Sequence, residues 1–89
     1  MVSWNKMQRY IITFKPRALK DGKRIPKDHL KRIFEAIENL SDGLKGDVKH
    51  LTNYSPEYRL RVGDYRVLFE IEDEKIIIYR IRHRKEVYK

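Results

Sequence analysis

The chain has 89 residues, which is enough for one domain with a modest hydrophobic core and too few for a second functional domain. It contains no cysteine, which excludes disulfides and cysteine-based zinc sites, and its three histidines are too scattered along the sequence to suggest a metal site. Lysine and arginine number 21 against 13 aspartate and glutamate, and the resulting net charge of +8 favours a polyanionic partner.

The N-terminal part of the chain predicts a strand and a short helix. Residues 9–14 (RYIITF) are rich in β-branched and aromatic side chains and stop before Pro16, so we expect a strand there. A short helix is expected from Pro16 to Arg24, because proline suits the first helical position and Gly22 lies near the end of the segment.

A second, longer helix follows. Pro26 opens it, and the cluster Ser41-Asp42-Gly43 closes it. Its apolar residues recur at helical spacing and form one stripe: Leu30, Ile33, Phe34, Ile37 and Leu40. Gly46 and Asp47 then indicate a loop, and a connecting segment leads on through Pro56.

The C-terminal part changes to a period of two, which is typical of strands. We expect strands at 58–62, 65–72 and 75–82, joined by tight turns at Gly63-Asp64 and Asp73-Glu74. Residues 83–89 are expected to form a basic tail beyond the last strand.

The order of one strand, two helices and three strands predicts an α+β fold in a single domain, residues 1–89. We expect a four-stranded, mainly meandering antiparallel sheet packed against an N-terminal helical hairpin. The apolar run from Ile76 to Ile78 predicts that the last strand is central in the sheet, with both faces covered.

Two segments of the sequence resemble those by which the RelE/ParE superfamily of toxin-antitoxin toxins is usually identified. They are RVGDYRVLFEI, residues 61–71, and HRKEVY, residues 83–88. The resemblance extends over nearly the whole chain, because the order of strand, helical hairpin and meander also matches. It implies a RelE-like fold with a cleft where the meander meets the C-terminal tail. RelE toxins cleave messenger RNA in the ribosomal decoding site, whereas ParE toxins share the fold and poison DNA gyrase, so the fold alone does not choose between them.

The basic residues of the hairpin suit RNA chemistry. Arg59 and Arg61 are two positions apart and point to one face of a strand, and the Gly63-Asp64 turn folds Arg66 back beside them. Such guanidinium groups repel one another unless an anion lies between them, and phosphate accepts two parallel hydrogen bonds from each. RNA is cut without metal when its 2′-hydroxyl attacks the adjacent phosphorus, and fixed cations stabilise the charge that develops.

The resemblance also implies roles for individual residues. Positions 59 and 61 are often lysines in RelE toxins; here both are arginine, which stays protonated and is a poor general base. His83 is then the best candidate for proton transfer. Either Arg82 or Arg84 faces the scissile phosphate or the leaving oxygen, and Tyr88 stacks on a base or orients the nucleophile. The expected catalytic residues are Arg61, Arg66, Arg82, His83, Arg84 and Tyr88, and the expected RNA-binding residues are Arg59, Lys85 and Lys89.

Each of these roles has a structural alternative. Arg59 and Arg61 also fit the solvated face of an edge strand, which charges protect from aggregation. Arg66 also fits an ion pair with Glu70 or Glu72, and Arg80 is interpreted as structural. His83 fits an ordinary surface residue, and Tyr88 an aromatic side chain that covers the core.

The predicted function is that of the toxin of a type II toxin-antitoxin system: a ribosome-dependent, metal-independent mRNA endoribonuclease with no cofactor. Its expected partners are the ribosome, mRNA and an acidic antitoxin, in a complex that is a heterotetramer or larger. The alternatives are a ParE-like inhibitor of gyrase and a non-catalytic RNA-binding homologue of the toxins. No apolar run is long enough to span a bilayer and the N-terminus does not look like a signal peptide, so we expect a cytoplasmic protein that does not bind membranes.

Overall fold

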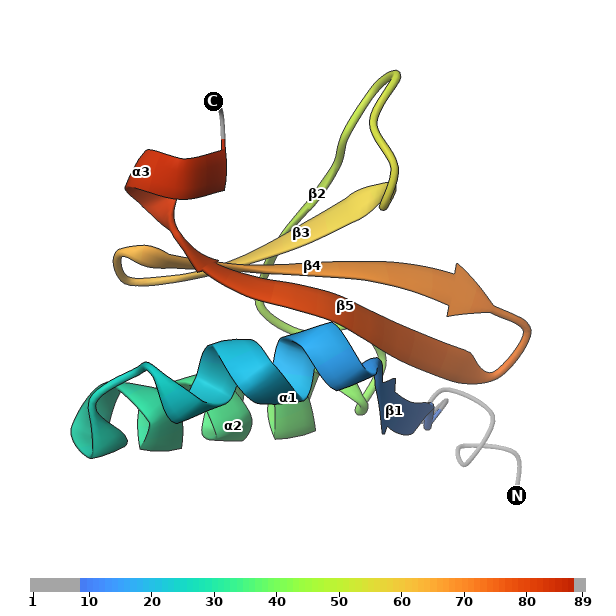
Figure 1. Cartoon of the computed structure of the whole chain (residues 1–89). Helices are drawn as coiled ribbons and strands as arrows, with labels where there is room; N and C mark the ends of the chain where they lie inside the picture. The colour runs from blue at the N-terminus through green and yellow to red at the C-terminus, as the bar shows by residue number, and fades with distance from the viewer. Residues whose placement is uncertain (1–8, 88–89) are drawn as a thin grey trace.

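A computed structural model describes residues 9–87 and has the predicted α+β architecture, with two helices packed on one face of a single sheet (Figure 1). The strands and helices are β1 Ile11–Phe14, α1 Pro16–Lys23, α2 Lys27–Leu40, β2 Asp47–His50, β3 Tyr58–Val62, β4 Tyr65–Glu72, β5 Lys75–His83 and α3 Arg84–Val87. None of the helices in this part of the chain is long and apolar enough to cross a membrane.

The sheet has the strand order β1-β5-β4-β3-β2. Strands β3, β4 and β5 form the predicted antiparallel meander, while β1 pairs in parallel with the first half of β5. Strand β5 therefore has a neighbour on each side, as the apolar run from Ile76 to Ile78 predicted. The antiparallel pairing of β4 with β5 brings the C-terminal end of β5 next to the β3–β4 turn.

Within the described residues 9–87 the sheet has five strands rather than the predicted four. Asp47 to His50, expected to begin in a loop, form β2, an edge strand that pairs antiparallel with β3. Val48 is the one apolar residue in β2, so the segment carries no alternating pattern that distinguishes a strand from a loop. Its pairing with β3 is the feature that makes it a strand.

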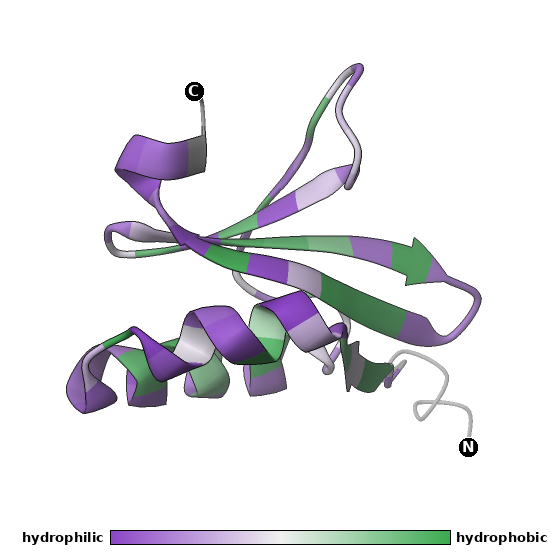
Figure 2. Ribbon diagram, viewed as in Figure 1, coloured by the Kyte–Doolittle hydropathy of each residue, from purple (hydrophilic) through white to green (hydrophobic). Residues whose placement is uncertain are grey.

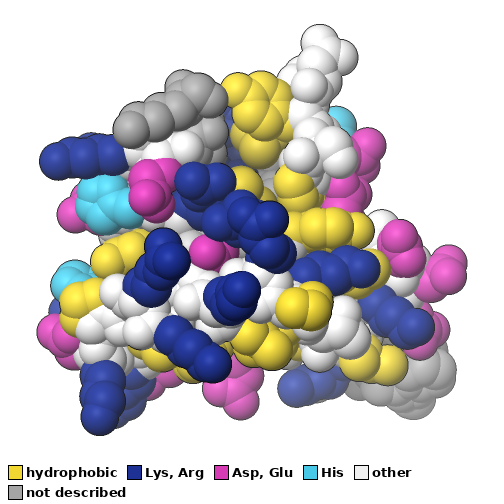
Figure 3. Space-filling model, in the orientation of Figure 1, with side chains coloured by type: hydrophobic (Ala, Val, Ile, Leu, Met, Phe, Trp, Pro, Cys, Tyr) yellow, Lys and Arg dark blue, Asp and Glu magenta, His cyan; other side chains and the backbone are white. Residues whose placement is uncertain are grey.

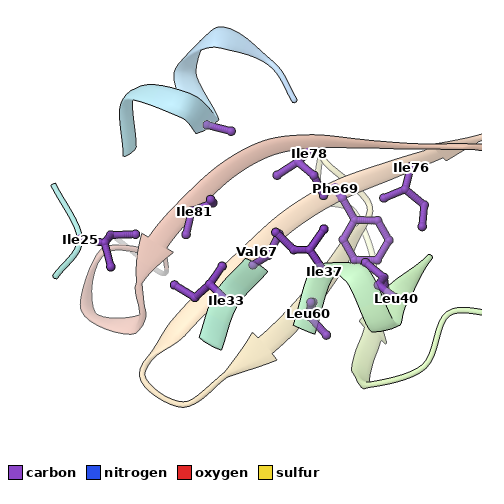
Figure 4. Close-up of a cluster of buried hydrophobic side chains, with 11 residues drawn as sticks. Ile25, Ile33, Ile37, Leu40, Leu60, Val67, Phe69, Ile76, Ile78 and Ile81 are labelled. Atoms are coloured by element: carbon purple, nitrogen blue, oxygen red, sulfur yellow. The ribbon is translucent and has the colours of Figure 1, made fainter. Parts of the chain in front are cut away.

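The hydrophobic core lies between α2, α1 and one face of the sheet (Figure 4). Side chains of β3, β4 and β5 point into it, and Figure 2 shows the hydrophobic stretches of β4 and of the first half of β5. Its buried side chains are Ala18, Ile25, Ile33, Ile37, Leu40, Leu60, Val67, Phe69, Ile76, Ile78 and Ile81. The residues next to them in β3 and in the first half of β4 therefore face away from α1 and α2, whereas Arg80, beside the register shift between β4 and β5, forms an ion pair with Asp21 of α1.

Helix α1 lies along the part of β5 that β1 does not reach. Strand β1 ends at Phe14, opposite Ile78, so beyond this point no strand of residues 9–87 pairs with that edge of β5. The carboxylate of Asp21 on α1 accepts a hydrogen bond of 2.9 Å from the Ile81 amide on this edge. A side chain of α1 thus satisfies a backbone donor that would otherwise lack a partner.

The end of the chain differs from the predicted basic tail. Strand β5 continues through His83, and α3 follows it directly. Helix α3 contacts β4 and β5 and lies on the side of the sheet opposite to α1 and α2 (Figure 1).

Candidate functional site

Three arginines lie side by side across the central strands of the sheet. Arg61 of β3 is directly opposite Arg66 of β4, and Arg66 is directly opposite Arg82 of β5. Their neighbours Leu60, Val67 and Ile81 point into the core, so the register places the three arginines on the opposite face of the sheet, with Arg82 at the edge of β5 close enough to α1 to line a cavity with Asp21. We call Arg61, Arg66 and Arg82 the arginine row. The row places residues of the β3–β4 hairpin next to one residue of the C-terminal segment, Arg82.

Like charges placed directly opposite one another destabilise a sheet. The row contains two such pairs, Arg61 with Arg66 and Arg66 with Arg82. An anion bound over the row removes this repulsion, and the planar guanidinium group can donate two parallel hydrogen bonds to phosphate or carboxylate. The geometry therefore fits a ligand that carries negative charge.

Arg66 is the most buried member of the row, with 9% of its surface exposed. Its Nη1 donates hydrogen bonds to the carbonyl oxygens of Gly63, at 2.9 Å, and of Tyr65, at 3.0 Å. These bonds tie the guanidinium group to the β3–β4 turn, where Gly63 has a φ of 59° that favours glycine. The predicted alternative, an ion pair with Glu70 or Glu72, does not form, and Glu70 instead accepts a hydrogen bond of 2.9 Å from the Glu57 amide.

Unsatisfied donors mark the same face of the sheet. The Nε atoms of Arg59, Arg66 and Arg82 are buried and have no hydrogen-bond partner within residues 9–87. Arg59 lies on this face because it is two positions from Arg61 on β3, and only 12% of its side chain is exposed. A buried donor without a partner is costly, and three of them lie on this one face of the sheet.

Asp47 of β2 is the carboxylate that reaches this group of arginines. It lies opposite Arg61 in the sheet register, and its oxygens are 3.6 Å from Arg59 Nη2 and 3.4 Å from Arg61 Nε. Sequence reasoning missed Asp47, because it was assigned to a loop and nothing in its neighbourhood indicates which strand it pairs with.

His83 does not lie with the arginine row. It pairs with Tyr65 in the sheet register, and the two rings are in edge-on contact with centroids 5.4 Å apart. Tyr65 also contacts His29 of α2, at 5.7 Å, which places both residues on the helix side of the sheet. The Nδ1 of His83 accepts a hydrogen bond of 3.2 Å from the Lys85 amide. The structure thus uses His83 to cap the start of α3 and places its ring on the face opposite Arg61 and Arg66, while His83 and Arg82 both line one cavity at the edge of β5.

Arg84 is also outside the row. Its backbone amide donates to the Asp64 carbonyl oxygen at 2.7 Å, and its Nε lies 3.6 Å from the Asp64 carboxylate. Of the two candidates for contact with a phosphate, Arg82 therefore lies in the row and Arg84 lies at the β3–β4 turn. Lys85 is exposed on α3, while Tyr88 and Lys89 are outside the described residues.

A cavity of about 240 Å³ adjoins the row at the open edge of β5. Arg82 and His83 of β5 line it together with Asp21 of α1, Arg24 just after α1, Tyr65 of β4 and Glu86 of α3. Basic side chains also gather on the neighbouring surface over α1 and β5 (Figure 3). Within residues 9–87, no group of three or more histidine, aspartate or glutamate side chains is arranged to hold a metal ion.

Comparisons with known proteins agree with this architecture. The family model described as "ParE toxin of type II toxin-antitoxin system, parDE" matches residues 12–88. Toxin RelE3 of Methanocaldococcus jannaschii is 38% identical over 82 residues, which cover 86% of this chain and 93% of that protein.

Solved toxin-antitoxin complexes contain similar folds. The RelB-RelE complex from Methanococcus jannaschii matches with a TM-score of 0.72 and 38% identity, covering 84% of this chain and 93% of the other. The RelE-RelB complex from Pyrococcus horikoshii OT3 matches with a TM-score of 0.71 and 28% identity, covering 89% of this chain and 99% of the other.

Proposed function

The chain belongs to the RelE/ParE superfamily and is a type II toxin-antitoxin toxin of the RelE family, and on this basis we propose that it inhibits translation as a ribosome-dependent mRNA endoribonuclease. The observation that carries the proposal is the arginine row: three guanidinium groups in adjacent register positions on one face of the sheet. RNA is the polyanion whose own 2′-hydroxyl supplies the nucleophile, so such a site needs to supply alignment and positive charge.

The proposed reaction is a phosphoryl transfer within the RNA. The bond between the 2′-oxygen and phosphorus forms as the 2′-hydroxyl gives up its proton to water, and the bond between phosphorus and the 5′-oxygen breaks as that oxygen takes up a proton from water, leaving a 2′,3′-cyclic phosphate and a 5′-hydroxyl. Arg61, Arg66 and Arg82 stabilise the negative charge that develops on the phosphate oxygens. Arg59, beside the row, and Lys85 and Lys89, on and after α3, bind the flanking backbone of the RNA.

The row favours catalysis by charge stabilisation over catalysis by a histidine. Arginine stays protonated at any working pH and so acts as a fixed cation. His83, the predicted proton-transfer residue, is on the other face of the sheet, where its Nδ1 is engaged by the Lys85 amide. We therefore assign Arg82 to the scissile phosphate and keep Tyr88, which follows α3, as the residue that stacks on a base or orients the nucleophile.

The proposed partners follow from the charge of the site. An antitoxin with an acidic segment neutralises the arginines by occupying the same face, in a complex that is a heterotetramer or larger. The solved relatives include complexes of RelE with RelB, which supports an antitoxin partner for this chain. The ribosome and mRNA are the proposed targets, so the protein acts in the cytoplasm.

Inhibition of DNA gyrase is the second candidate, because the matching family model is described for ParE toxins. An inhibitor that does no chemistry has no need of adjacent guanidinium groups around a phosphate. The RelE relative at 38% identity also favours the endoribonuclease.

One experiment separates the two candidates. The purified protein is added to a reconstituted translation system, and the mRNA is analysed by primer extension and by the chemistry of its new ends. We expect cleavage that requires ribosomes and leaves 5′-hydroxyl ends. Intact mRNA together with inhibited supercoiling by gyrase in a parallel assay would replace the endoribonuclease by the gyrase inhibitor.

A further inference from the structure

Asp47 places a negative charge at the end of the arginine row. It lies on the edge strand β2, directly opposite Arg61, on the face that carries Arg61, Arg66 and Arg82. The preceding residue, Gly46, has a φ of 129°, and a Cβ there would lie 2.9 Å from Leu60 Cδ1. Glycine is therefore required where the chain enters β2, and this backbone path brings the Asp47 carboxylate to the arginines.

The contacts of Asp47 with the two arginines of β3 are loose. Its carboxylate is 3.6 Å from Arg59 Nη2 and 3.4 Å from Arg61 Nε, longer than the 2.7–2.9 Å or so of a charge-assisted hydrogen bond. The Asp47 side chain is 54% exposed. The Arg61 side chain is also exposed, at 56%, and an exposed ion pair with such geometry contributes little to stability, so an incoming anion can displace the carboxylate from Arg61; the Arg59 side chain is 12% exposed, and its contact with Asp47 is the longer of the two.

Asp47 faces two arginines that the proposed RNA site would use. A phosphate bound by Arg59 and Arg61 has to approach the guanidinium groups that the carboxylate already faces. Within residues 9–87, Asp47 is the one carboxylate that forms an ion pair with either of these arginines. It is therefore an internal competitor for part of the proposed RNA site.

We propose that Asp47 makes the site discriminate against free single-stranded RNA, by competing with phosphate for Arg59 and Arg61. The proposal rests on the proposed function and deepens it. Competition from a fixed carboxylate weakens the binding of any free single-stranded RNA. An RNA strand held in place by a larger assembly has a high effective concentration at the site and displaces the carboxylate. The preference for RNA held in an assembly then comes from the repulsion between the Asp47 carboxylate and phosphate, in addition to the attraction of the arginines for phosphate.

The opposite role for Asp47 makes the opposite prediction. If the carboxylate served to hold Arg59 and Arg61 in the geometry that binds RNA, removing it would weaken binding. The sign of the change in affinity therefore distinguishes a competitor from a positioning residue.

The test measures the affinity of the protein for free RNA. A 2′-O-methylated single-stranded RNA, which cannot be cleaved by 2′-hydroxyl attack, is titrated with the wild type, D47N and D47A, and binding is followed by fluorescence anisotropy at several salt concentrations. The matched control is D73N, which removes one negative charge from the exposed β4–β5 turn, away from the row. Circular dichroism melts confirm that each variant is folded at the temperature of the titration.

We expect both Asp47 variants to bind the RNA about three- to tenfold more tightly than the wild type, with a steeper dependence on salt, since more phosphate contacts are made. The D73N control should bind within about twofold of the wild type. Asp47 variants that bind no more tightly than D73N, or more weakly than the wild type, would overturn the proposal.

The result is independent of cleavage. If neither the wild type nor D47N cuts mRNA on ribosomes but D47N binds RNA more tightly than D73N, the endoribonuclease proposal fails and the competition by Asp47 stands. If the wild type cleaves mRNA and the affinities of D47N and D73N are equal, the function stands and the role of Asp47 is wrong.

Discussion

Asp21 of α1 and Arg80 of β5 form an ion pair with two hydrogen bonds, from Arg80 Nε to Oδ2 at 2.8 Å and from Arg80 Nη2 to Oδ1 at 3.0 Å. Oδ2 also accepts the hydrogen bond from the Ile81 amide. The two side chains are only 16% and 24% exposed. One carboxylate thus fixes α1 against β5 next to Arg82, and Arg80 has the structural role interpreted from the sequence.

The first prediction concerns this ion pair. Replacing Asp21 by Asn keeps the shape of the side chain but removes the charge that accepts three hydrogen bonds, so the free energy of unfolding should fall by about 2 kcal/mol. Urea denaturation of the variant measures this change. D73N serves as the control for loss of one carboxylate and should lie within about 0.5 kcal/mol of the wild type. Equal stability of D21N and D73N would show that the pair does not hold α1 in place.

The second prediction is the pH dependence of the same contact. Burial raises the pKa of Asp21, but the hydrogen bonds from Arg80 and the Ile81 amide and the charges of Arg80 and Arg82 lower it by more, so the pKa lies below its ordinary value of 3.8. A carboxyl group with a lowered pKa stabilises the folded state above its unfolded pKa, and this contribution is lost as the pH falls through the folded pKa. The stability difference between the wild type and D21N should be constant above about pH 5 and shrink below about pH 4. A difference that grows in acid would contradict the assignment.

The third prediction separates two members of the arginine row. Arg66 is buried and donates to two carbonyl oxygens of the β3–β4 turn, whereas the side chain of Arg61 is 56% exposed. Arg66→Ala should therefore lower the free energy of unfolding by about 1–3 kcal/mol, and Arg61→Ala should change it by less than about 0.5 kcal/mol. Both should reduce mRNA cleavage. Comparable stability of the two variants in urea would mean that Arg66 does not support the turn.

The fourth prediction concerns His83. Because its ring lies on the helix side of the sheet against Tyr65, His83→Gln should change the rate of mRNA cleavage by less than about threefold. Single-turnover cleavage on ribosomes measures the rate, with thermal melting as the control for loss of the α3 cap. A loss of about a hundredfold or more, together with a changed pH profile, would restore His83 as the proton-transfer residue.

The periodicity of the sequence was sufficient to predict the helical hairpin and the meander. The apolar stripe of α2 and the alternation in β3, β4 and β5 are strong local signals, and their boundaries agree with the structure to within one or two residues. Strand β2 has one apolar residue, and it exists because β3 offers it a hydrogen-bonding edge. The parallel pairing of β1 with β5 joins segments far apart in the chain, which no local pattern indicates.

In the candidate site, the alternation of side chains along a strand gave the correct face of the sheet for residues whose strand boundaries were predicted correctly. Arg61 and Arg66 are each separated by one residue from the two-residue turn Gly63-Asp64, so the position of this turn predicts that they lie opposite each other. His83 was assigned to a tail, but β5 continues through it, and the next position of the alternation turns its side chain to the face opposite Arg82. Asp47 and Asp21 were missed because each meets its arginine partners only through tertiary packing.

The central claim, that the arginine row binds the scissile phosphate, is tested most directly by comparing Arg82 with Arg84. The measurement is the single-turnover rate of mRNA cleavage on ribosomes for Arg82→Ala, Arg84→Ala and the exposed control Arg17→Ala on α1. The position of Arg82 in the row predicts a loss of about a hundredfold or more for Arg82→Ala. Arg84→Ala should lose less than about tenfold, because Arg84 lies at the β3–β4 turn, and the control should match the wild type. A greater loss for Arg84→Ala than for Arg82→Ala, or an Arg82→Ala rate equal to that of the control, would contradict the claim.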